Sequence, residues 1–227
     1  MPLQPDRSRQ CVLVFLKWPE KGRVKTRLAR DTGPAIALDL YRNFVADTLQ
    51  MLENGGHQTI ICFHPPHAEE RTAGWLGRAY PLWPQTGADL GEKMAAAFST
   101  AFARGAERVL LMGTDIPDLP EAVITEAFAS LEQHPVTIGP AWDGGYYLIG
   151  FHSDGFTPAV FRDIPWSTGS VFQKTLAILK RRGLSPHLLP RWRDIDTGED
   201  LAAFMAANPP GAAPNTRACI RAAGLFS

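Results

Sequence analysis

The sequence lacks a net charge, because its 23 Lys and Arg side chains are balanced by 23 Asp and Glu in 227 residues. Proteins that bind nucleic acids normally carry a basic surface, so this balance argues against a nucleic-acid partner. No apolar run approaches the roughly 20 residues of a membrane span. Residues 1–10 are polar and lack the apolar stretch of a signal peptide. We therefore expect a cytoplasmic protein with no membrane span.

Cysteine is also scarce, with Cys11, Cys62 and Cys219 as its three positions. Their spacing fits neither a disulfide framework nor a zinc or iron–sulfur site. Cys11 and Cys62 lie in apolar, strand-like runs, where a thiol is most simply a small core residue. An odd number of cysteines without a framework suits a reducing compartment.

Glycine-rich nucleotide loops are missing too. A P-loop requires Gly directly before its Lys, and here Val24 precedes Lys25. A dinucleotide-binding fingerprint requires three spaced glycines, whereas the corresponding loop has only Gly22. These two departures exclude the ATPase and dehydrogenase readings of this loop.

The sequence does contain alternating strand-like and helix-like segments, which are typical of an α/β domain with a mainly parallel sheet. No linker or repeat divides the chain, so we expect one domain over residues 1–227. Residues 1–10 and 208–227, the latter with a short helix, are expected to be peripheral tails. Strands are predicted at residues 11–16, 59–63, 108–112, 136–138, 146–151 and near 188–189, and helices at 34–53, 88–104, 121–132 and 170–182.

Asp115 follows the clearest of these strands. Four consecutive apolar residues at 109–112 are typical of an interior parallel strand. Ligands of open α/β sheets bind just beyond the carboxyl ends of strands. A carboxylate at this place can hold a divalent cation, and the cation can hold a diphosphate. The alternative is that Asp115 caps the next helix or makes a turn.

Asp196 is the second candidate metal ligand. It lies in an Ile-Asp-Thr-Gly-Glu-Asp run that, taken alone, resembles an ordinary helix N-cap. Mg²⁺ is typically held by one or two carboxylates, with substrate phosphates completing its shell. We therefore predict that Asp115 and Asp196 bind one Mg²⁺ or Mn²⁺ ion, with their carboxylates within about 10 Å of each other.

A basic loop follows the first predicted strand. A strand–loop–helix with basic side chains is a good anion cradle, because free backbone N–H groups add to the side-chain charge. The alternative is a solvated basic loop. If Lys25 and Arg27 lie on a helix, they cannot share a face, so we expect Arg27 on donor phosphates and Lys25 on a carboxylate or solvent. The candidate donor residues of the loop are Lys17, Gly22, Lys25, Thr26 and Arg27.

Asp143, Gly144 and Gly145 form an Asp-Gly-Gly run between two predicted strands. Asp-Gly is a strong hairpin signal, so a turn is one interpretation. The other is that the glycines allow a ligand close to the backbone. In that case Asp143 would be a catalytic carboxylate facing an acceptor hydroxyl or the metal, with Gly144, Gly145 and Tyr146 on the acceptor side.

Two helix starts carry the remaining candidates. Trp166 and Ser167 precede the helix at 170–182, where they are either a core plug and a cap or part of the acceptor site. Asp89 is the expected N-cap of the helix at 88–104. Gly91 and Lys93 behind it are candidate donor contacts.

Together these segments resemble the bacterial family of predicted glycosyltransferases known as domain of unknown function 2064. That family is grouped with the nucleotide-diphospho-sugar transferases of the GT-A type. The resemblance covers roughly residues 11–201. The segments that carry it are Lys17-x-Pro-x-x-Gly-x-x-Lys-Thr-Arg-Leu28, Gly113-Thr-Asp-Ile-Pro117, Gly139-Pro140, Asp143-Gly-Gly-Tyr-Tyr-Leu148 and Pro165-Trp-Ser167.

The resemblance implies a Rossmann-like three-layer α/β/α sandwich with a mixed, mainly parallel sheet. It also implies a metal-dependent glycosyltransferase that moves a sugar from a nucleotide-diphosphate donor to a small acceptor, and it leaves room for a homodimer. The loop from Lys17 to Arg27 would cover the donor phosphates, and Asp115 would take the place of the metal-binding aspartate. Asp196 is similar to the second metal aspartate of sugar-acid cytidylyltransferases.

Two alternatives stay open. The Lys-Thr-Arg-Leu run at 25–28 is also similar to phospholactate guanylyltransferases, so a guanylyl- or cytidylyltransferase that releases pyrophosphate is the second reading. A nucleotide-binding protein without turnover is the third, because the sequence identifies no general base. Product analysis separates the three: glycosyl transfer releases a nucleoside diphosphate, nucleotidyl transfer releases pyrophosphate, and a binding protein releases neither.

Overall fold

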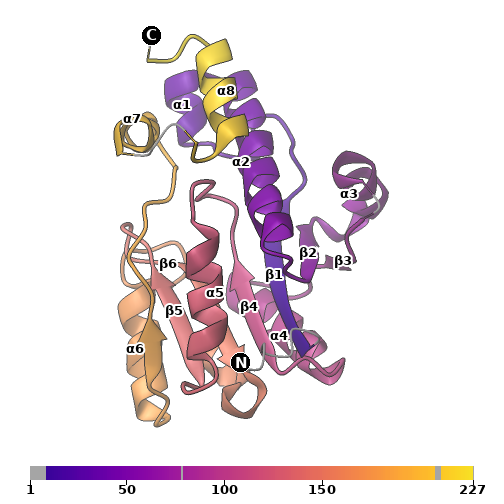
Figure 1. The fold of residues 1–227 in the computed structure, drawn as a ribbon, viewed down its shortest axis with the longest axis vertical. Coiled ribbons are helices and arrows are strands. Elements are labelled where there is room, and N and C mark those ends of the chain that lie inside the picture. The colour runs from indigo at the N-terminus through magenta and orange to yellow at the C-terminus, as the bar shows by residue number, and fades with distance from the viewer. Residues whose placement is uncertain (1–8, 78, 208–210, 227) are drawn as a thin grey trace, which may run out of the picture.

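The core of the protein is a seven-stranded sheet (Figure 1). The computed structural model describes residues 9–77, 79–207 and 211–226. The strands are β1 Gln10–Lys17, β2 Thr59–His64, β3 Leu82–Pro84, β4 Arg108–Met112, β5 Val136–Pro140, β6 Tyr146–His152 and β7 Pro186–Leu188. Their order is β3-β2-β1-β4-β6-β5-β7. Strand β6 runs antiparallel to β4 and β5, and the other neighbouring pairs are parallel, as the prediction of a mixed, mainly parallel sheet requires.

Helices cover both faces of this sheet. Alternate residues of β1 point to opposite faces, and both sets are buried. Val12 and Val14 pack with α2 (Pro34–Asn54) and α5 (Glu121–Ser130), whereas Cys11 and Leu13 pack with α4 (Leu90–Ala103) and α6 (Val171–Arg181). The predicted three-layer α/β/α sandwich is thereby confirmed. The helices are α1 Leu28–Thr32, α2 Pro34–Asn54, α3 Glu69–Leu76, α4 Leu90–Ala103, α5 Glu121–Ser130, α6 Val171–Arg181, α7 Gly198–Ala207 and α8 Pro214–Ala222.

A third apolar cluster joins α1, α7 and α8 to α2, at the top of Figure 1. Ile220 of α8 is fully buried there, and Asp47 of α2 accepts hydrogen bonds from the backbone N–H groups of Asn215 and Thr216. The expectation of a peripheral C-terminal tail is therefore wrong for α8, because its apolar side completes a core. Residues 1–8, 208–210 and 227 lie outside the described residues.

The predicted strands and helices are all present, and the elements outside the predicted ranges have at most ten residues. Helices α1, α3 and α7 and strand β3 fall in stretches without a long periodic pattern. Short 3₁₀ turns among the described residues are η2 Pro66–Ala68, η3 Ser153–Gly155 and η4 Pro158–Phe161. No described helix is long and apolar enough to cross a membrane.

The strand order places a crevice at one edge of the sheet. From β1 the chain adds β2 and β3 on one side, and then returns to add β4 on the other side of β1. This reversal between β1 and β4 is the topological switch point, where open α/β sheets bind ligands. Lys17 ends β1 and Asp115 follows β4, so both predicted site segments meet at this point.

Candidate active site

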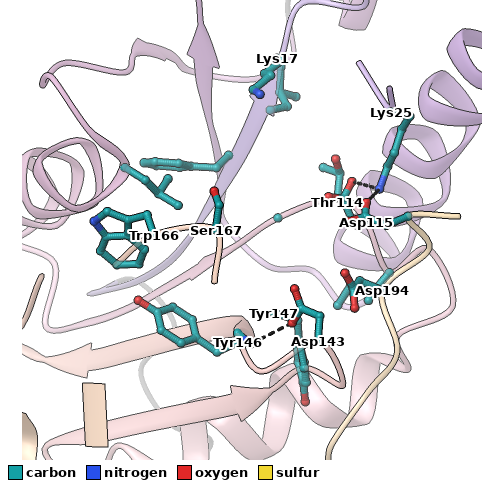
Figure 2. A pocket seen from close by; sticks show the side chains of 18 of the residues that line it. Lys17, Lys25, Thr114, Asp115, Asp143, Tyr146, Tyr147, Trp166, Ser167 and Asp194 are labelled. Carbon is teal, nitrogen blue, oxygen red and sulfur yellow. Dashed lines mark hydrogen bonds and ion pairs between the residues drawn. The ribbon is translucent and has the colours of Figure 1, made fainter. Parts of the chain in front are cut away.

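A cavity of about 630 Å³ lies at the carboxyl ends of β1 and β4 (Figure 2). Its volume falls in the range of small-molecule sites. The sequence-predicted residues that line it are Lys17, Lys25, Thr26, Arg27, Asp115, Asp143, Gly145, Tyr146, Trp166, Ser167 and Asp196. The structure therefore brings the basic loop, both candidate metal ligands and the acceptor-side segments to one place.

Asp115 and Asp196 meet around the ammonium of Lys25. Lys25 Nζ lies 2.8 Å from Asp115 Oδ1 and 2.8 Å from Asp196 Oδ1, so these two oxygens can be no further apart than twice 2.8 Å. The carboxylates are thus well within the 10 Å separation expected from the sequence. Lys25 also donates to the carbonyl oxygen of Ile195 at 2.7 Å.

The residues around this cluster are fixed by their backbone. The N–H of Ile195 donates to the carbonyl oxygen of Asp115 at 2.8 Å, which joins the loop after β4 to the segment before α7. Residues 21–27 form turns, and α1 begins only at Leu28, so Lys25 is not helical as the sequence argument assumed. Lys25 has φ 47°, in the left-handed region that is uncommon for residues other than glycine.

A capping box holds Asp196 in place. Asp200 Oδ2 accepts hydrogen bonds from the N–H groups of Asp196 and Thr197, and Thr197 Oγ1 accepts one from the N–H of Asp200. Arg193 donates to the other oxygen of Asp200 at 3.1 Å. This reciprocal arrangement satisfies the N–H of Asp200 in the first turn of α7 and the two N–H groups just before the helix. The N-cap reading of the segment and its place in the cavity are therefore compatible.

The cluster contains more negative than positive charge near Lys25. Burial alone would lower the pKa of Lys25, but the charges of Asp115 and Asp196 and their hydrogen bonds outweigh burial and raise the pKa. Lys25 therefore stays protonated. Burial and the nearby charge of Asp143 raise the pKa of Asp194 to about 6. Asp194 also lines the cavity and was not predicted as a site residue, because the helix-capping signal of this segment lies at Asp196 and Thr197.

The other basic residues of the loop are solvent-exposed. The Arg27 side chain is 64% exposed, and its nearest carboxylate oxygen, Asp196 Oδ2, is 3.8 Å away. Arg23 is 76% exposed and pairs with Glu20 at 3.2 Å. Tyr41 fixes the end of β1, because its hydroxyl accepts from the N–H of Lys17 and donates to the Lys17 carbonyl oxygen. Arg27 is therefore free to bind an anion, whereas Lys25 is fully engaged.

The loop between β5 and β6 forms the predicted turn. Asp143 Oδ1 accepts from the N–H of Gly145 at 2.8 Å, and the side chain faces the cavity (Figure 2). Gly144 has φ 88°, and a Cβ there would lie 2.1 Å from the carbonyl oxygen of Gly169. Only glycine allows this approach without a shift. Gly144 therefore supports the loop and is not among the described residues that line the cavity.

Trp166 and Tyr146 form an apolar wall opposite the charged cluster (Figure 2). Leu90 and Met94 of α4 and Phe15 of β1 also line the cavity. Ser167 beside this wall has φ 65°, a left-handed conformation that often occurs at functional sites. Trp166 thus contacts the core and the cavity together, so both interpretations of this residue apply.

Gln85 is a cavity residue that sequence reasoning missed. It is 9% exposed, and its Nε2 donates to the carbonyl oxygens of Leu16 and Cys62 at 3.2 and 2.8 Å. These two hydrogen bonds fix the amide and leave Oε1 as the polar atom that Gln85 can offer to a ligand. No local pattern marks a lone Gln after a three-residue strand, so the sequence offered no signal for it.

Three predicted donor residues lie elsewhere among the described residues. Gly22 and Lys93 do not line the cavity, and the positive charge of Lys93 contributes, after burial, to the lowered pKa of His64. Gly91 is buried in α4, where a Cβ would clash with the Phe161 carbonyl oxygen and with Trp166. We therefore assign Gly91 to helix packing.

The two carboxylates fit a divalent cation that is shared with a ligand. The described residues contain no group of three or more His, Cys, Asp or Glu side chains that could hold a metal by themselves. Asp115 and Asp196 converge and both line the cavity, and their side chains are 47% and 33% exposed. This donor set matches Mg²⁺ or Mn²⁺, which bind one or two carboxylates and complete their shell with phosphate oxygens.

Residues 48–168 match a family described as uncharacterized proteins conserved in bacteria, DUF2064. The match covers more than half of the chain. The chain belongs to this family. A solved structure from Desulfovibrio desulfuricans G20, named provisionally as a nucleotide-diphospho-sugar transferase, is 41% identical over 95% of both chains, with a TM-score of 0.89. The resemblance noted from the sequence motifs is thereby confirmed.

More distant solved structures share the fold. CMP:2-keto-3-deoxy-manno-octonic acid synthetase in complex with CTP is 11% identical, with a TM-score of 0.52 over 88% of this chain and 99% of its own. Rv0371c from Mycobacterium tuberculosis H37Rv in complex with manganese is 16% identical, with a TM-score of 0.51 over 88% of this chain and 100% of its own. A search of curated proteins gave no match. The fold is therefore that of nucleotide-diphospho-sugar transferases and nucleotidyltransferases.

Proposed function

We propose that this protein is a metal-dependent glycosyltransferase that moves a sugar from a nucleotide-diphosphate donor to a small acceptor. The observation that carries the proposal is the two-ended cavity at the switch point. One end holds Asp115, Asp196 and the basic loop, and the other holds Trp166 and Tyr146. A nucleotide sugar likewise joins a charged diphosphate to less polar groups.

At the charged end, Arg27 would bind the donor phosphates, because its guanidinium is exposed and its planar fork matches phosphate oxygens. Thr26 and Lys17 line the same end and would add hydrogen bonds. Asp115 and Asp196 would hold Mg²⁺ or Mn²⁺, which supplies neutralisation of the diphosphate when it is bound.

At the acceptor end, Asp143 would accept a proton from the acceptor hydroxyl. Its Oδ1 is held by the N–H of Gly145, which orients the carboxylate and leaves Oδ2 for a ligand. Trp166 and Tyr146 would pack against the acceptor or the sugar, and Ser167 would donate a hydrogen bond. The apolar wall would also limit the access of water to the transferred group.

Nucleotidyl transfer is the second candidate. It is favoured by the fold of the distant relatives, which include the CTP-bound synthetase and an inositol-1-phosphate CTP transferase from T. maritima. Under this reading Arg27 would bind a triphosphate and the reaction would release pyrophosphate. The charged end of the cavity could bind either product, the nucleoside diphosphate of glycosyl transfer or the pyrophosphate of nucleotidyl transfer.

Product analysis tests the proposal. The protein is incubated with Mn²⁺, a panel of nucleotide sugars or nucleoside triphosphates, and pooled small hydroxylated acceptors. We expect an acceptor-dependent release of nucleoside diphosphate that is lost in Asp143→Asn. Release of pyrophosphate would replace the first candidate by the second, and binding without either product would leave a nucleotide-binding protein.

A further inference from the structure

Lys25 occupies the point that a cation shared by Asp115 and Asp196 would take. Its ammonium lies 2.8 Å from one oxygen of each carboxylate and 2.7 Å from the carbonyl oxygen of Ile195. A lysine ammonium has three N–H donors, so each donor of Lys25 has an acceptor inside the protein. In this arrangement Lys25 has no donor left for a phosphate oxygen.

The protein holds Lys25 at this point firmly. Its side chain is 4% exposed, and its ammonium also lies over the ring of Phe44, 5.6 Å from the centroid. The backbone adopts φ 47°, which costs free energy for a residue with a Cβ. Such strain persists where the surroundings compensate for it, and here the three hydrogen bonds of the ammonium provide the compensation.

We propose that the Lys25 ammonium is a resident counter-ion of the Asp115–Asp196 pair, and that Lys25 and a divalent cation exclude each other at this point. The inference rests on the proposed function, from which it takes the cation and the donor phosphates. A cation bonded to both inner oxygens at roughly 2.0–2.6 Å would touch Lys25 Nζ. Two positive charges in contact, with little solvent between them, repel strongly.

Displacement gives Lys25 a second position. Once the cation replaces it at the carboxylates, the ammonium has three free donors in a cavity that it shares with Thr26 and Arg27. Donor phosphates would then be its acceptors. The cation and the nucleotide therefore favour each other's binding through Lys25, in addition to their direct contact. Lys25 can therefore pair with the carboxylates in the free protein and bind the donor phosphates once the cation has displaced it.

The affinity for Mn²⁺ alone tests the exclusion directly. We would measure it by calorimetry or by the electron paramagnetic resonance of free Mn²⁺ for the wild type, Lys25→Met and Lys21→Met. Lys21 is an exposed lysine of the same loop and serves as the matched control. Lys25→Met should bind Mn²⁺ at least about tenfold more tightly than the wild type. Lys21→Met should bind Mn²⁺ with the affinity of the wild type. Unchanged or weaker binding by folded Lys25→Met overturns the exclusion.

Thermal unfolding gives a second readout that does not depend on turnover. Without a cation, Lys25→Met leaves two neighbouring carboxylates uncompensated, so its midpoint should fall by roughly 5–10 °C. Mn²⁺ should raise this midpoint more than that of the wild type. If Lys25→Met is too unstable to purify, Lys25→Gln, which keeps a hydrogen-bond donor, takes its place. A lower midpoint that Mn²⁺ does not restore would make Lys25 a purely structural residue.

The coupling between Mn²⁺ and nucleotide separates this inference from the proposed function. We would titrate UDP, GDP and CDP into wild type and Lys25→Met with and without Mn²⁺. Because chelation in solution is the same for both proteins, any excess cooperativity in the wild type comes from Lys25. If the wild type binds no nucleotide and no Mn²⁺, the proposed function fails. If it binds both with equal cooperativity in the two proteins, the Lys25 exchange alone fails.

Discussion

Arg27→Ala should weaken nucleotide binding while leaving the fold unchanged. The guanidinium is 64% exposed, and its 3.8 Å approach to Asp196 is too long and too solvated to add much stability. The free energy of unfolding should therefore change by less than about 0.5 kcal/mol. In the complex, by contrast, Arg27 is expected to make charge-assisted hydrogen bonds to the donor phosphates.

Losing such bonds costs about 1.5–3 kcal/mol, which corresponds to a roughly 10- to 150-fold lower affinity. Calorimetric titration of a nucleoside diphosphate in the presence of Mn²⁺ measures the change. Lys21→Ala removes one exposed charge from the same loop and should keep the parent affinity. Arg27→Lys keeps the charge but not the bidentate fork, so its affinity should fall between the other two.

Equal affinities of Arg27→Ala and the parent would refute this reasoning. In that case the exposed guanidinium is a solvated side chain, and the donor phosphates lie elsewhere in the cavity. A large loss of thermal stability in Arg27→Ala would contradict the geometric argument in another way, because it would show that the 3.8 Å pair is stronger than its exposure suggests. Unfolding midpoints measured on the same samples distinguish these outcomes.

Three further predictions concern Asp115, the nucleobase contact of Gln85 and the turn at Gly144. Asp115→Asn keeps an acceptor for Lys25 and should fold, but turnover should fall roughly 100-fold or more; normal turnover at saturating Mn²⁺ would make Asp115 a turn residue only. Gln85 lines the same cavity, and we expect its Oε1 to accept a hydrogen bond from the nucleobase. Gln85→Met removes this acceptor and should lower the affinity for a nucleotide roughly tenfold without changing the affinity for ribose 5-phosphate. Equal losses for both ligands would contradict the expected contact with the nucleobase. Gly144→Ala places a Cβ 2.1 Å from the Gly169 carbonyl oxygen and should destabilise the fold by roughly 1–3 kcal/mol or more. Gly183→Ala is the control, because Gly183 also has a positive φ, 70°, but has open space around it, so this variant introduces backbone strain without a clash. Chemical denaturation of both variants should show a smaller loss in the free energy of unfolding for Gly183→Ala.

The sequence alone determined the architecture because its longer elements carry strong local signals. The four apolar residues at 109–112 and all of the run at 11–16 except the half-buried Phe15 are buried in the sheet, and strands buried on both faces have continuous apolar sequences. The stripe of the long helix α2 repeats with the helical period, which marks its buried face. Short elements such as β3 and α1 lack room for a period, so they could not be predicted in this way.

The candidate site, too, could be predicted from the sequence only in part. The ends of the predicted strands located Asp115 and the loop from Lys17 to Arg27 at one edge of the sheet, since parallel strands end together. The partner of Lys25 could not be read from the sequence, because Asp196 lies 171 residues further along the chain. The packing of α7 against α1, the capping box of Thr197 and Asp200, and the hydrogen bond between Ile195 and Asp115 bring Asp196 to Lys25.

Residues that look alike in the sequence also have different roles in the folded protein. Lys25 and Arg27 are two basic residues of one loop, yet the tertiary structure buries the first between two carboxylates and leaves the second in solvent. Gln85 became a fixed acceptor because two strand ends meet beside it. Local sequence determines which segments form strands and helices, since that depends on neighbours within a few residues. Burial and charge partners depend on contacts between distant segments, and these exist only once the chain has folded.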